Sequence, residues 1–109
     1  MIDNIVSPGH SYKIVFSCYE VRMSHWIEQP HLIRVSDSKI VFSLNGASWS
    51  AFKVQWHDDE TVFMRVSKYP GRISLDITLN VNRDAGSAVG EFKSFSGTLS
   101  QVSNWILAL

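Results

Sequence analysis

Residues 73–82 are Ile73-Ser74-Leu75-Asp76-Ile77-Thr78-Leu79-Asn80-Val81-Asn82, and they are the best guide to the architecture of this chain. Aliphatic and polar residues alternate in this stretch without a break. Successive side chains of a pleated strand point to opposite faces of the sheet, so a strand here would place every aliphatic residue on one face and every polar residue on the other. The stretch therefore predicts a β-strand with one buried face.

Segments rich in β-branched and aromatic residues recur on both sides of this strand, separated by turn-forming sequences. Two of the turns, Asn45-Gly46 and Pro70-Gly71, favour type I′ and type II geometry because glycine supplies a positive φ. We expect strands at residues 12–19, 32–35, 40–44, 49–56, 61–68, 73–82 and 89–95. The predicted fold is mainly β: a six- or seven-stranded antiparallel meander, which forms either a partly open barrel or a sandwich.

The end of the chain changes to helical periodicity. Thr98 and Gln101 have the spacing of a capping box, and apolar residues then recur at helical intervals. A helix this short is marginal alone in water, so we expect residues 98–109 to form a helix that packs on the sheet and closes one end of it.

Two other segments are harder to interpret. Residues 20–30 fit neither period, so a bent strand or a short helix would serve equally, and Pro30 is expected to mark a break. Trp49 falls out of register with Val54 and Trp56 farther along the same predicted strand, which a bulge near Ser50 would reconcile.

Length and composition limit the class of protein. The 109 residues fit one domain, residues 1–109, and the ten basic and ten acidic side chains cancel. Zero net charge argues against nucleic acid as a partner. No segment is long and apolar enough to span a bilayer, and the first residues do not have the pattern of a secretory signal. With one cysteine and hence no internal disulfide, we expect a soluble protein of the cytoplasm that makes no membrane contact.

No catalytic, cofactor or metal motif is present in the sequence. His10, His25, His31 and His57 lack the spacing of a known metal site, and no nucleophile elbow or phosphate-binding glycine loop occurs. Cys18 alternates in register with apolar residues, so we expect it to be a buried, unreactive thiol. We therefore predict no catalytic residue, no cofactor and no bound metal.

The best candidate for a binding surface is a face that mixes aromatic and basic residues. In the predicted register, Phe63, Arg65 and Tyr69 point away from the apolar side of their strand, and the neighbouring strand would bring Lys53 and Trp49 close to them. Aromatic residues and arginine on one exposed face are typical of interaction hot spots. The alternative is that a second layer, such as the C-terminal helix, covers this face and makes it part of the core.

Three functions are compatible with these observations. A non-enzymatic protein-binding module, such as an inhibitor or an immunity-type antitoxin, fits best because chemical motifs are lacking. The alternatives are a carrier of a small apolar ligand inside a barrel, and an enzyme whose scattered His, Asp and Glu meet only in the folded chain. An open sheet also leaves edge strands, so a homodimer is possible.

Overall fold

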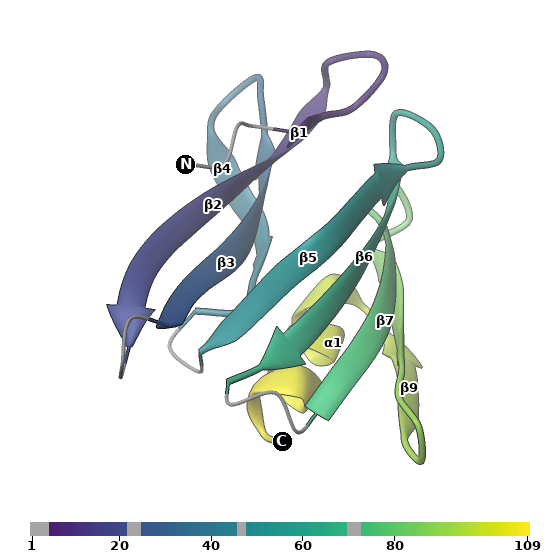
Figure 1. The fold of residues 1–109 in the computed structure, drawn as a ribbon. Coiled ribbons are helices and arrows are strands. Elements are labelled where there is room, and N and C mark those ends of the chain that lie inside the picture. Colours follow the sequence, from purple (N-terminus) through teal and green to yellow (C-terminus); the bar gives the residue numbers. More distant parts are fainter. Residues whose placement is uncertain (1–4, 22–24, 46–47, 70–72) are drawn as a thin grey trace.

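The computed structural model describes residues 5–21, 25–45, 48–69 and 73–109. Within them the chain forms two antiparallel sheets and one helix (Figure 1). The four-stranded sheet has the order β1-β2-β3-β4 and the five-stranded sheet the order β5-β6-β7-β8-β9, so every strand pairs with its sequence neighbour within its sheet. The elements are β1 (Ile5–Val6), β2 (Tyr12–Val21), β3 (His25–Arg34), β4 (Lys39–Ser43), β5 (Trp49–Trp56), β6 (Thr61–Lys68), β7 (Ile73–Asn80), β8 (Ala85–Val89), β9 (Ser94–Gly97) and α1 (Leu99–Leu107).

This architecture confirms the mainly β meander with a C-terminal helix. It is two separate sheets and not a closed barrel. The described strands number nine, more than the six or seven expected. One additional strand is the short β1. The other arises because residues 89–95, expected as one strand, contain the end of β8, the turn after it and the start of β9.

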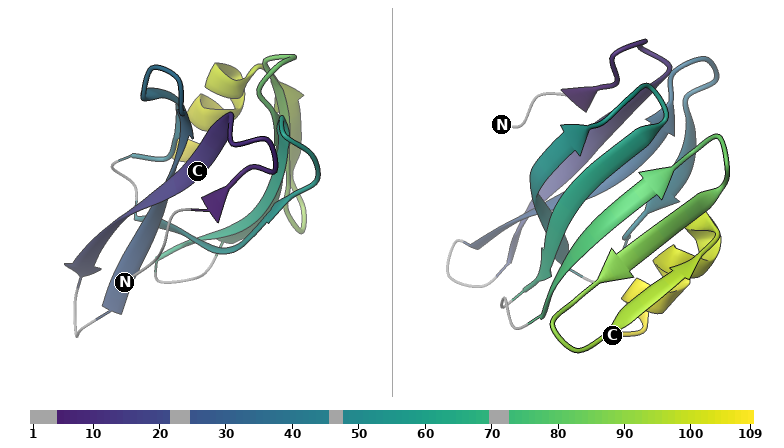
Figure 2. Two further views of the ribbon diagram at one scale, coloured as in Figure 1. Left: turned by 90° about the horizontal axis from the view of Figure 1, so that it is seen from above. Right: turned by 90° about the vertical axis from the view of Figure 1, so that its right-hand side faces the viewer.

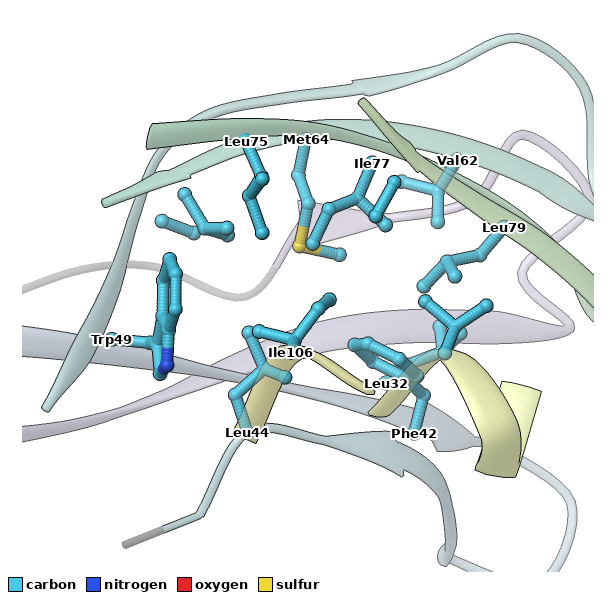
Figure 3. Close-up of a cluster of buried hydrophobic side chains, with 14 of the residues drawn as sticks. Leu32, Phe42, Leu44, Trp49, Val62, Met64, Leu75, Ile77, Leu79 and Ile106 are labelled. Atoms are coloured by element: carbon cyan, nitrogen blue, oxygen red, sulfur yellow. The ribbon is translucent and has the colours of Figure 1, made fainter. Parts of the chain in front are cut away.

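The core lies between the inner faces of the two sheets, with α1 inserted along one side (Figure 3). The predicted buried face of β7 is confirmed, because Leu75, Ile77 and Leu79 are buried in this core. The helix begins with the predicted capping box: Thr98 accepts a hydrogen bond from the Gln101 amide, and the Gln101 side chain accepts one from the Thr98 amide. It contributes three buried residues, Leu99, Val102 and Ile106.

Residues 25–34 form one continuous strand, so the expected break at Pro30 is wrong. β4 pairs with β3 only from His31 onwards. Among the described residues, Pro30 therefore has no β4 partner on that side of β3, which is a position where a sheet tolerates a residue without an N–H. The turns predicted at Asn45-Gly46 and Pro70-Gly71 lie partly or wholly outside the described residues.

One carboxylate connects the two sheets. Asp59, in the turn between β5 and β6, accepts hydrogen bonds from the hydroxyls of Ser7 (2.6 Å) and Ser11 (2.5 Å) and from the Gly9 amide (2.7 Å). These bonds hold the pKa of Asp59 at about 2, below its usual 3.8. A Cβ at Gly9 would lie 2.6 Å from the Asp59 carboxylate, so a side chain at position 9 would force the carboxylate to shift.

Candidate functional site

The outer face of the five-stranded sheet is open. In the right-hand view of Figure 2 this face points toward the viewer and no other element lies over it. The helix cannot cover it, because α1 contacts β4, β8 and β9 and its apolar residues belong to the core between the sheets. The alternative in which the helix makes this face part of the core is therefore excluded.

Phe63 on β6 lies among polar and charged neighbours on this face. The Lys53 ammonium is 5.8 Å from the centre of the Phe63 ring, within the range of a cation–π contact. The His57 ring centre is 6.4 Å from it. The side chain of Phe63 is half-buried in the isolated chain. This arrangement offers an aromatic surface beside the cationic group of Lys53.

Arg65, two residues along β6, makes an ion pair with Asp76 on β7. Its Nε lies 2.7 Å from Oδ1 and its Nη2 3.3 Å from Oδ2. The pair raises the pKa of Arg65 and lowers that of Asp76, and the charge of Lys53 lowers the Asp76 pKa further. Lys53 itself makes no ion pair within the described residues. The row Lys53, Arg65 and Asp76 therefore carries one positive charge that the fold leaves unpaired.

The structure brings together three of the five residues that the sequence proposed for this surface. Lys53 pairs in register with Arg65, and Phe63 lies beside both. We name the outer-facing side chains of Lys53, Phe63 and Arg65, with Asp76, the basic-aromatic face. The other two proposed residues lie elsewhere.

Trp49 is fully buried, which corrects its predicted place on the surface. The register of β5 shifts between Ala51 and Lys53, so Phe52 is the bulged residue. Because of this bulge, Trp49 and Ala51 face the core together with Val54 and Trp56, although a regular strand would place the two pairs on opposite faces. The predicted bulge exists, but two residues beyond Ser50. As a result Trp49 lies at one end of the core cluster in Figure 3, and its indole N–H has no hydrogen-bond partner among the described residues.

Tyr69 lies just beyond the end of β6, apart from the basic-aromatic face. Its ring centre is 5.3 Å from that of His25, the first residue of β3. Tyr69 therefore joins the two sheets and is half-buried in that contact.

The four histidines do not converge on one site. Within the described part of the chain, none of them hydrogen-bonds or ion-pairs with a carboxylate, as the enzyme alternative would require. His31 instead lies between two hydroxyls on the four-stranded sheet, with Nε2 2.6 Å from Ser17 Oγ and Nδ1 2.8 Å from Ser43 Oγ. Burial lowers the pKa of His31. Among the described residues, no group of three or more His, Cys, Asp or Glu side chains could hold a metal ion.

Some exposed side chains were missed by sequence reasoning. Cys18 is exposed and not buried, because β2 runs on beyond the core at that point. Trp26, Phe52 and Phe92 are also exposed, the last at 90%. One signal for the exposure of Phe92 is present in the sequence, because Gly90, two residues earlier, is of the type that marks a bulge or tight bend.

Two hollows of the described residues open at the surface, one beside the β8–β9 turn and the other beside the start of β2. Neither has the enclosed form that a ligand carrier needs. No described helix has the length and apolar character needed to cross a membrane. Comparison of the chain with protein-family models, with curated proteins and with solved structures finds no match.

Proposed function

We propose that this protein is a non-enzymatic protein-binding module that docks a partner on its basic-aromatic face, in the manner of an inhibitor or an immunity-type antitoxin. The observation that carries the proposal is the open outer face of the five-stranded sheet, with Phe63 beside the unpaired charge of Lys53. Aromatic residues and arginine supply much of the binding energy in protein interfaces, whereas charged groups at the rim mainly set specificity and association rate.

The charge of the face indicates the chemistry of the partner. Asp76 neutralises Arg65, but Lys53 remains free to pair with a carboxylate. A partner that presents an acidic side chain next to an apolar one would match Lys53 and Phe63 together. We therefore assign an acidic protein surface as the occupant, and the cytoplasm as the setting, since the single cysteine, Cys18, is a free thiol.

The test is affinity purification of the tagged protein from its native host, with wild type and two charge-reversed variants compared by mass spectrometry. Lys53→Glu changes the basic-aromatic face, whereas Lys39→Glu makes the same change on an exposed lysine of β4 in the other sheet. We expect a stoichiometric protein that is retained by wild type and Lys39→Glu and lost with Lys53→Glu. A partner that Lys53→Glu retains at full yield would contradict the assignment of this face.

The thermal stability of each variant is measured in parallel. Surface substitutions usually change the free energy of unfolding by less than about 0.5 kcal/mol. A loss of the partner without a loss of stability therefore separates binding from folding.

A further inference from the structure

The turn between β8 and β9 presents one large apolar side chain to solvent. The Gly90 amide donates a hydrogen bond to the Lys93 carbonyl (2.7 Å), which closes a tight turn with Glu91 and Phe92 at its tip. Phe92 is 90% exposed there. A Cβ at Gly90 would lie 2.9 Å from Leu75 Cδ2, so glycine also lets the turn pack closely against β7. Phe92 is thus held out from the protein on a short, well-defined turn.

A hollow of about 370 Å³ lies directly beside this turn. It exists because β8 pairs with β7 only from Asp76 onwards and leaves Ile73–Leu75 without a neighbouring strand on that side. Apolar side chains supply much of its lining: Ile73, Leu75, Leu109 and Phe92. Lys68 donates a hydrogen bond to the Leu109 carbonyl (2.5 Å), which fixes that wall of the hollow. The hollow is large enough to admit an aromatic ring.

A protruding aromatic residue and an apolar hollow therefore lie side by side on one surface. A two-fold axis through such a surface places the protrusion of each copy opposite the hollow of the other, which is the geometry of an isologous dimer. The charges next to Phe92 fit the same symmetry. Glu91 precedes it and Lys93 follows it, so each copy carries both an acidic and a basic side chain beside Phe92, as reciprocal ion pairs across a two-fold axis would require.

We propose that this chain forms a homodimer in which Phe92 of each copy enters the hollow of the second copy, with reciprocal Glu91–Lys93 pairs beside it. The surface is self-complementary in shape and in charge, which favours a second copy over an unrelated partner. A turn and a hollow bury less than the roughly 1,000 Å² of a stable interface, so the dimer dissociates on dilution. The proposed dimer surface contains none of the residues of the basic-aromatic face.

The first test is sedimentation velocity from low micromolar to millimolar concentrations of the whole chain. Wild type is expected to change from monomer to dimer over this range, and Phe92→Ser is expected to remain monomeric. Phe52→Ser is the matched control, because Phe52 is also an exposed phenylalanine but lies on β5, away from the turn. A wild type that stays monomeric throughout, or a dimer that Phe92→Ser leaves intact, would overturn the proposal.

Charge exchange tests the symmetry directly. Glu91→Lys and Lys93→Glu each place like charges opposite one another in a homodimer, so each variant alone should associate about tenfold more weakly than wild type. An equimolar mixture of the two restores both opposite-charge pairs and should dimerise as wild type does. A mixture that is no more dimeric than its components would refute the two-fold arrangement, even if Phe92→Ser abolishes association.

Discussion

Replacing Phe63 by alanine should cost far less stability than the same change at Phe42. Phe42 lies in the core and is 3% exposed, whereas Phe63 lies on the basic-aromatic face. Truncating a buried phenylalanine typically costs about 3–5 kcal/mol, because apolar surface is lost and a cavity remains. On an open face no cavity forms, so the losses are the contact with Lys53, about 0.5–1 kcal/mol for an exposed cation–π pair, and the apolar contacts of a half-buried ring, about 1 kcal/mol. We therefore expect a difference of about 1–3 kcal/mol between the two variants.

The assay is equilibrium unfolding in urea, with the free energy of unfolding extrapolated to zero denaturant for wild type, Phe63→Ala and Phe42→Ala. Both variants should keep the wild-type dependence on urea, which shows that the substitution changed stability and not the unfolding mechanism. If Phe63→Ala is as damaging as Phe42→Ala, another part of the protein covers Phe63. The basic-aromatic face would then be closed to a partner.

Three further substitutions test other parts of the fold. The pKa of Asp59 is about 2, so its hydrogen bonds stabilise the protein fully above pH 4, and this contribution is lost as the pH falls toward 2. Asp59→Asn should therefore flatten the decline of Tm between pH 4 and pH 2. The control Glu20→Gln should leave that decline unchanged. Burial lowers the pKa of His31 below 6.5, so the unfolded chain binds a proton at a higher pH than the folded chain, and the free energy of unfolding falls as the pH drops below about 6.5. His31→Gln should reduce this loss of stability between pH 7.5 and pH 5.5, as measured by urea unfolding. A loss equal to that of wild type would rule out His31 as its cause. Trp49→Phe removes an indole N–H that has no hydrogen-bond partner among the described residues. Relief of the penalty for burying an unpaired donor, about 1–3 kcal/mol, should offset much of the stability lost with the smaller ring. A loss of stability as large as that of Phe42→Ala would show that the N–H is paired.

Features set by local sequence could be predicted. The alternation of β7 assigned its buried and exposed faces correctly, and the capping box located the start of α1. In both cases the deciding residues are within a few positions of one another. Opposite faces for Met64 and Phe63 also followed from alternation alone, which is why part of the basic-aromatic face could be found.

Features that depend on distant contacts could not be predicted. Whether the strands form a barrel or two sheets depends on which strands pair across the fold, and alternation carries no information about that choice. Placing Trp49 on the same face as Lys53 carries a regular register across β5, whereas the bulge at Phe52, which is set by the pairing with β6, puts these two side chains on opposite faces. Pro30 does not break β3 because β4 pairs with β3 only from His31 onwards, and the residues around Pro30 carry no information about how far β4 extends.

Isothermal titration calorimetry of the captured partner against wild type, Lys53→Glu and Lys39→Glu tests whether the basic-aromatic face is the binding surface. If the partner binds the basic-aromatic face, Lys53→Glu should raise Kd at least about tenfold, equivalent to about 1.4 kcal/mol, while Lys39→Glu leaves Kd unchanged. Equal affinities for all three proteins would place the partner on another surface and contradict the account.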